Sequence, residues 1–169
     1  MIINGIKLAA AKIKIAKLVK NRQPELYSAP VKSVGIIFDY KNHKAYHVLQ
    51  RLKTQFNISD SNFKVAMYVG SGKKPAGFEG LIYSLKCIDM DAEINNEGMR
   101  EFTSESVDLL VTFAEENNTA VHLLSAYCRA GIKVGRFLQN VALFDMIIQS
   151  ENDAELFTEE LSKYLKQLK

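Results

Sequence analysis

Three short runs of almost uninterrupted apolar residues constrain the fold of this chain more than any other feature. They occupy residues 33–39, 63–69 and 107–113, and each is rich in Val, Ile or Phe. Runs of this length and composition predict β-strands that are buried on both faces of a sheet. Segments with apolar residues at helical spacing follow them, and this alternation predicts a mainly parallel sheet with helices on both faces.

The other predicted elements are shorter or less regular. Helices are expected at about 43–56, at 119–130 and from Asp153 onwards, with Asn42 and Thr119 as N-caps of the first two. Strands are expected at 132–134 and 143–148, with a short one within 81–88, whereas the acidic stretch 89–106 is ambiguous. The chain of 169 residues therefore predicts a single Rossmann-like α/β domain at 33–169, preceded by a basic helix at 1–23 and a linker at 24–32.

Composition places the chain among globular proteins of a reducing compartment. Hydrophobic residues make up 47% of it, and nine Gly and three Pro are too few for a fibrous or low-complexity protein. Neither cysteine, Cys87 or Cys128, lies in a CxxC motif. No apolar run approaches the ~20 residues of a transmembrane helix, and the N-terminus lacks the apolar core of a signal peptide. We therefore expect a cytoplasmic protein.

The N-terminal segment carries more positive charge than folding requires. Residues 1–32 hold seven basic side chains and one acidic side chain, whereas the rest of the chain is net acidic. On a helix, the apolar residues of this segment form two stripes on roughly opposite sides. One stripe contains Leu8, Ala11, Ile15, Leu18 and Val19, and the other contains Ile2, Ile6, Ala9 and Ile13. A single docked surface cannot cover both, so we expect the helix to stand partly apart from the body and to make two contacts.

This helix is the main candidate for an interaction surface. The leading prediction is a non-enzymatic module that binds through it to RNA or the ribosome, to an acidic protein or to a second copy of the chain. DNA is not expected, and the absence of Trp and Phe from the helix disfavours a membrane surface. The predicted partner-binding residues are Ile6, Lys7, Ile13, Lys14, Lys17, Lys20 and Arg22.

Residues with catalytic or metal-binding chemistry do not form a recognisable motif. His43 and His47 are spaced i, i+4, but no spacing links them to His122 or Asp39, the obvious nominees for a third ligand. The serines lack a GxSxG context, and neither cysteine has a local base signature. We therefore expect no catalytic residue, no metal and no cofactor, and the balance is against an enzyme.

A second candidate surface is the edge where the parallel strands end. The loop at 70–77 follows a predicted strand, but its glycines lack P-loop spacing and Pro75 stands where a P-loop helix would start. Ligands of open α/β sheets bind at the carboxyl ends of the strands. The side chains expected at a ligand rim there are Asp39, Ser71, Lys73, Lys74 and Glu115.

Longer motifs carry two resemblances. Residues 107–137, VDLLVTFAEENNTAVHLLSAYCRAGIKVGRF, resemble part of the N-terminal domain of heptosyltransferase-like glycosyltransferases. Nearly the whole chain is similar to a small uncharacterised bacterial α/β domain family, through K-S-V-G-I at 32–36, S-A-Y-x-x-A-x-x-K-V-G at 125–135, F-D-M-I at 144–147 and a helical end at Tyr164-Leu165. These motifs are largely core residues, which specify fold better than chemistry.

The glycosyltransferase resemblance implies an alternative function, that of a related nucleotide- or nucleotide-sugar-binding protein or enzyme. Those enzymes close two Rossmann-like domains over the substrate and use an acidic residue in a glycine-containing loop after the first strand. This chain has the length of one domain, and its corresponding stretch at 39–43 has Asp39 but no glycine. We therefore expect no sugar transfer by this chain alone.

Overall fold

The computed structural model describes residues 2–23, 30–70, 77–137 and 142–167 of the chain. The helices are α1 (Ile2–Lys20), α2 (His43–Leu49), α3 (Arg51–Gln55), α4 (Glu97–Ser104), α5 (Thr119–Tyr127) and α6 (Ala154–Gln167). The strands are β1 (Val34–Asp39), β2 (Phe63–Tyr68), β3 (Leu81–Tyr83), β4 (Val107–Phe113), β5 (Ala130–Gly135) and β6 (Met146–Ile147). Short 3-10 helices lie at Tyr40–Asn42, Asp60–Asn62 and Leu85–Cys87.

The strands form one sheet in which every pairing is parallel, in the order β3-β2-β1-β4-β5-β6. Val34 of β1 lies opposite Phe63 of β2 on one side and opposite Leu109 of β4 on the other. All six residues of β1 are buried, as expected for a central strand of a sheet that is covered on both faces. The predicted parallel sheet is therefore confirmed, and the domain is a doubly wound, Rossmann-like α/β fold.

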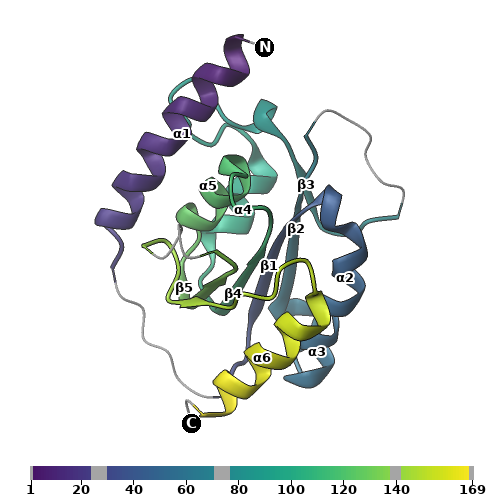
Figure 1. The fold of residues 1–169 in the computed structure, drawn as a ribbon. Coiled ribbons are helices and arrows are strands. Elements are labelled where there is room, and N and C mark those ends of the chain that lie inside the picture. The colour runs from purple at the N-terminus through teal and green to yellow at the C-terminus, as the bar shows by residue number, and fades with distance from the viewer. Residues whose placement is uncertain (1, 24–29, 71–76, 138–141, 168–169) are drawn as a thin grey trace.

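Helices cover both faces of the sheet (Figure 1). The core on one face contains Ile36 and Phe38 of β1 together with apolar residues of α2, α3 and α6. The core on the other face contains Ile37 of β1 together with apolar residues of α4, α5 and α1. Successive side chains of a strand point to opposite faces, so β1 supplies both cores in alternation.

Helix α1 forms an outer layer along α5 instead of standing apart from the body (Figure 1). Ala11 is fully buried in the second core, and Ala10 and Ile15 pack against that core. The expected separation of the helix is therefore wrong, although one of its apolar stripes does pack on the domain and the other, with Ile2 and Ile13, is exposed. None of the described helices has the length and apolarity needed to cross a bilayer.

Two predicted helix caps are replaced by neighbouring residues. Asn42 makes no capping hydrogen bond, because the chain first forms a 3-10 turn that Asp39 caps by accepting from the Lys41 amide. The predicted helix 43–56 is divided at Gln50 into α2 and α3. Helix α5 is capped by Asn118, the residue before the predicted Thr119.

Other predicted boundaries move because strand pairing overrides the local pattern. Ala130 pairs with Val107, so α5 ends earlier than predicted and β5 begins earlier. Strand β6 is shorter than predicted, since only Met146 and Ile147 pair with β5. The ambiguous stretch 89–106 contains α4, which Asn96 caps by accepting from the Met99 amide. Most of the predicted linker, 24–29, lies outside the described residues.

Two glycines provide a matched test of the packing. A Cβ added at Gly135 in β5 would lie 2.3 Å from the ring of the buried Phe144. We expect Gly135→Ala to lower the free energy of unfolding by about 1–3 kcal/mol, because the ring must be displaced within a packed core. Gly5→Ala in α1 meets no atom within 4 Å and should raise stability by up to about 1 kcal/mol through helix propensity. Urea unfolding measures both changes, and a Gly135→Ala variant as stable as the wild type would contradict the packing.

Candidate functional site

The carboxyl ends of β1 and β4 lie side by side where the strand order reverses. Open α/β sheets bind ligands at this position. A hollow of about 750 Å³, which we call the switch-point crevice, opens there. Its lining comes from the ends of β1 and β2, the loop before α5 and the inner side of α1, and includes Asn4, Leu8, Asp39, Tyr40, Lys41, Tyr68, Glu115, Asn117 and Asn118.

Asp39, the last residue of β1, is 5% exposed and connects two loops of the crevice. Its Oδ1 accepts a hydrogen bond from the Lys41 amide at 2.9 Å, and its Oδ2 accepts one from the side-chain amide of Asn118. The carboxylate thus joins the loop after β1 to the loop after β4. The sequence predicted Asp39 at this edge but missed Asn118, which its place directly before a helix could have indicated.

Two tyrosines contribute ring surface to the crevice. Tyr68 ends β2, and burial raises the pKa of its hydroxyl, with the Asp39 carboxylate acting in the same direction. Tyr40 follows Asp39, is exposed, and stacks on His43 with 5.1 Å between the ring centroids. Tyr68 therefore stays protonated at neutral pH and keeps a hydroxyl that can donate.

A buried arginine lies at the same edge of the sheet and was missed by the sequence analysis. Arg136 follows β5 and is 3% exposed. Its guanidinium donates to the Ala114 carbonyl at 3.1 Å and to Asn152 Oδ1 at 3.0 Å, and it lies 4.1 Å from the ring centroid of Phe113. Burial lowers the pKa of Arg136, and the charge of Glu115 opposes that shift. Arg136 therefore ties the ends of β4 and β5 to the segment before α6.

Helix α1 forms one side of the crevice through Asn4 and Leu8. Three of the predicted partner-binding residues fasten this helix to the domain. Lys7 Nζ donates to the Leu85 carbonyl at 3.0 Å, Lys14 forms an ion pair with Glu93, and Arg22 forms one with Asp145 at 2.9 Å. The other four, Ile6, Ile13, Lys17 and Lys20, are exposed to solvent. The helix therefore has an inner side that is engaged and an outer side that is open.

The structure describes only some of the residues of the predicted ligand rim. Asp39 and Glu115 both line the switch-point crevice, from the ends of β1 and β4. Ser71, Lys73 and Lys74 lie outside the described residues. The rim that the structure describes therefore holds acidic and amide side chains, with Lys41 as a cation that the sequence analysis did not select.

The three histidines are not brought together. His43 and His47 belong to α2, on one face of the sheet, whereas His122 belongs to α5 on the other face. Within the described part of the chain, no three His, Cys, Asp or Glu side chains are grouped so that they could hold a metal ion.

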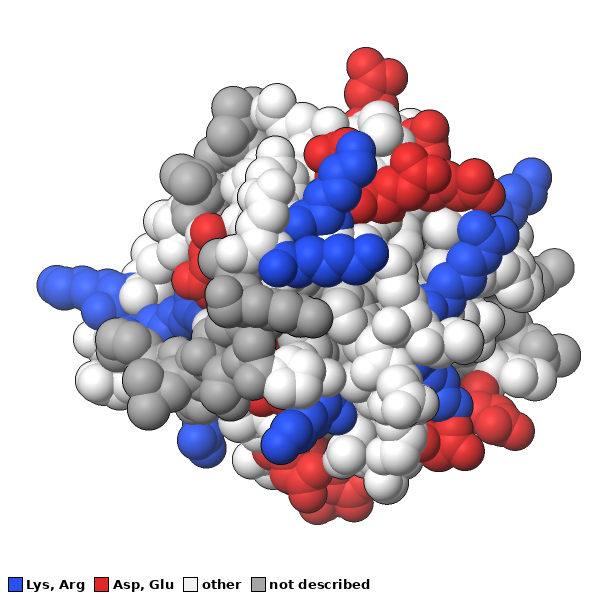
Figure 2. Space-filling view, turned by 90° about the horizontal axis from the view of Figure 1, so that it is seen from below, with Lys and Arg blue, Asp and Glu red and all other residues white. Residues whose placement is uncertain are grey.

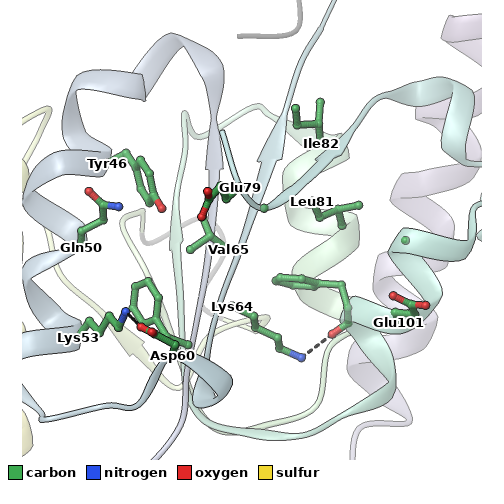
Figure 3. A pocket seen from close by; sticks show the side chains of 14 residues that line it. Tyr46, Gln50, Lys53, Asp60, Lys64, Val65, Glu79, Leu81, Ile82 and Glu101 are labelled. Atoms are coloured by element: carbon green, nitrogen blue, oxygen red, sulfur yellow. Dashed lines mark hydrogen bonds and ion pairs between the residues drawn. The ribbon is translucent and has the colours of Figure 1, made fainter. Parts of the chain in front are cut away.

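A second hollow, of about 860 Å³, lies at the outer edge of β2 between α2–α3 and α4 (Figure 3). We call it the edge groove. Strand β3 pairs only with Ala66, Met67 and Tyr68, so residues 63–65 of β2 stay at the edge of the sheet. Apolar side chains of the groove come from both sides of this edge and include Phe63, Val65, Leu81 and Phe102.

The lysines of the edge groove are already engaged, whereas two of its acids are not. Lys53 forms an ion pair with Asp60, and Lys64 Nζ donates to the carbonyls of Phe102 and Glu105 at the end of α4. Glu79 and Glu101 line the groove and form no ion pair with another described residue. Hydrogen bonds to neutral carbonyls leave the charge of Lys64 in place, so the described lining carries two lysines against the three acids Asp60, Glu79 and Glu101, which is a net charge of −1.

Charges on the side of the molecule where β1 begins are mixed in sign. Figure 2 looks at this side from below the view of Figure 1: acidic side chains gather in one cluster on it, whereas the visible basic side chains are scattered and form no continuous patch. Nucleic-acid backbones are bound by continuous positive surface. This side of the domain therefore does not favour RNA.

The fold is a single doubly wound α/β domain with a basic helix packed outside one helical layer. The chain belongs to DUF6913, a family of unknown function, whose family model matches residues 7–168. Comparisons with curated proteins and with solved structures found no match. Membership of this family assigns no activity to the chain. The resemblance of residues 107–137 to glycosyltransferases stays a prediction.

The buried His122 gives a testable pH dependence. It is 6% exposed, and desolvation lowers its pKa to about 4, with a backbone hydrogen bond at Asn118 acting weakly in the opposite direction. The folded state therefore binds this proton less readily than the unfolded chain, whose histidine has a pKa of about 6.5. Stability should fall as the pH drops from about 6.5 towards 4, with a loss of about 2 kcal/mol at pH 5 from this residue.

Urea unfolding at pH 5 and pH 8 measures this loss. His122→Gln should remove about 2 kcal/mol of the difference between the two pH values, because no imidazole is then left to titrate. His47→Gln, at an exposed position of α2, is the matched control and should leave the difference unchanged. The same pH dependence in wild type and His122→Gln would show that His122 is not desolvated.

Proposed function

We propose that this protein is a non-enzymatic interaction module whose helix α1 docks on a second copy of the chain. The observation that carries the proposal is the outward face of α1, which consists of Ile2, Ile3, Ile6, Ala9 and Ile13, all exposed. Ile2 is 81% exposed and Ile13 is 73% exposed, although the opposite side of the same helix is packed on α5. Exposed aliphatic rows of this kind are typical of interaction surfaces.

The spacing of the outward face supports a protein partner. Ile2, Ile6, Ala9 and Ile13 follow the i, i+4, i+7, i+11 pattern with which a helix inserts into an apolar groove. RNA would gain little from aliphatic side chains, because its affinity comes mainly from phosphate contacts. The helix also lacks the Trp or Phe with which amphipathic helices commonly insert into a bilayer surface.

Charge supports an acidic surface on that partner. Helix α1 has no acidic residue, and the side chains of Lys12, Lys17 and Lys20 form no ion pair or hydrogen bond with a described residue. A symmetric pairing of two α1 helices is disfavoured, since it would bring their lysines together without counter-charges. The complementary surface must therefore differ from α1 itself.

The edge groove has the complementary chemistry. Phe63 and Val65 contribute apolar surface to it, and its described lining has a net charge of −1, to which Glu79 and Glu101 contribute. Helix α1 is fixed on α5 by its inner side, so its outward face cannot enter the groove of the same chain. A contact between α1 of one copy and the edge groove of the next is heterologous, and it builds a ring or an open chain of copies.

A mixing experiment tests this contact. Ile6→Asp/Ile13→Asp disables the helix face, and Glu79→Lys/Glu101→Lys disables the groove. We expect the wild type to gain mass with concentration in size-exclusion chromatography with light scattering. Each variant alone should associate at least about tenfold more weakly, because it buries an unpaired charge or repels the lysines. An equimolar mixture should form a one-to-one complex, since each variant keeps one intact surface.

The control is Leu156→Asp, at an exposed apolar position of α6 outside both surfaces, which should associate as the wild type does. Circular dichroism confirms that all variants are folded. A wild type that stays monomeric at every concentration overturns the proposal, as does a mixture that stays monomeric. Binding of the wild type to an RNA hairpin or to phosphatidylserine vesicles that Ile6→Asp/Ile13→Asp abolishes would assign α1 to that surface instead.

A further inference from the structure

We infer that the switch-point crevice is a binding site for a small hydroxyl-bearing ligand without phosphate, such as a nucleoside or a free sugar. The crevice is separate from the outward face of α1 and from the edge groove. Its volume of about 750 Å³ suits a ligand of this size, and it lies where strands β1 and β4 diverge at the switch point of the sheet.

Four backbone amides around the crevice, those of Lys41, Asn118, Thr119 and Val121, are already bonded within the protein, which leaves fewer donors for a phosphate. Proteins with this strand order bind phosphate on free amides of a glycine-rich turn after β1 and at a helix N-terminus. Here the carboxylate of Asp39 occupies the amide of Lys41 at 2.9 Å, and no glycine lies between Asp39 and His43. At α5, Asn118 Oδ1 accepts from the Val121 amide at 3.2 Å. The amides of Asn118 and Thr119 are bonded within the loop to Glu115 and Asn117.

The side chains of the crevice favour groups that donate hydrogen bonds. Among the described residues of the lining, Asp39 and Glu115 present carboxylates and Asn117 presents an amide oxygen, against one cation, Lys41. Hydroxyl groups donate to such acceptors, whereas a phosphate dianion meets two like charges. Tyr40 and Tyr68 add aromatic surface against which a planar or ring-shaped ligand can pack.

Pairs of probes that differ by one phosphate group test whether the crevice disfavours phosphate. The melting temperature is measured with adenosine against adenosine monophosphate, and with glucose against glucose 6-phosphate. We expect the unphosphorylated probe of one pair to raise the melting temperature by roughly 6–10 °C at a concentration of about one hundred times its Kd. Its phosphorylated counterpart should bind at least tenfold more weakly. The pair that responds distinguishes a nucleoside from a sugar.

Three variants locate the binding. Asn4→Trp places a large ring at the wall that α1 gives to the crevice and should abolish the shift, whereas Ile2→Trp, on the outward face, should keep it. Glu115→Gln should weaken binding at least tenfold without disturbing Asp39. The measurements are repeated on Ile6→Asp/Ile13→Asp, where self-association is absent, so that their outcome is independent of the proposed docking. Tighter binding of a phosphorylated probe, an unaltered shift in Asn4→Trp or no shift with any of the four probes would overturn the inference.

Discussion

The fold depends on the burial of β1 between two parallel neighbours. Every residue of this strand is buried, and its register with β2 and β4 sets the position of the other strands. Parallel neighbours cannot be joined by tight turns, so each connection must cross a face of the sheet, and the crossing helices supply the two cores. After β1 the chain first forms β2 on one side of it and later returns to form β4 on the other side. The loops that follow β1 and β4 therefore lie next to each other, and Asp39 can accept a hydrogen bond from Asn118.

The sheet could be predicted from the apolar runs, because a strand that is buried on both faces has apolar residues at nearly every position. Strands β1, β2 and β4 lie within one residue of their predicted ends for this reason. The same logic fails at β6, where pairing with two residues of β5 limits the strand and the apolar pattern around it continues. The cap of α5 was predicted to within one residue, since adjacent polar side chains compete for the same free amides, whereas Asn42 precedes α2 without capping it.

The candidate site was predictable only where a residue ends a strand. Asp39 and Glu115 follow apolar runs, and their meeting follows from the parallel fold. The partnership of Asp39 with Asn118 depends on the order of the strands, which no local pattern encodes. Arg136 and Lys133 illustrate the same limit, since both are charged residues that the fold buries and that donate to the backbone carbonyls of Ala114 and Ser125, respectively. Their solvation is decided by tertiary neighbours and not by residue type.

The packing of α1 on α5 also has a consequence for synthesis. Helix α1 ends at Lys20, whereas α5 begins at Thr119, so α1 is synthesised well before its docking partner and has nothing to pack on until α5 has been translated. During that interval both of its aliphatic stripes face water. The nascent chain thus displays a cationic, two-sided apolar helix, which is the kind of segment that holdase chaperones bind. Completion of α5 withdraws one stripe and leaves the other on the finished protein.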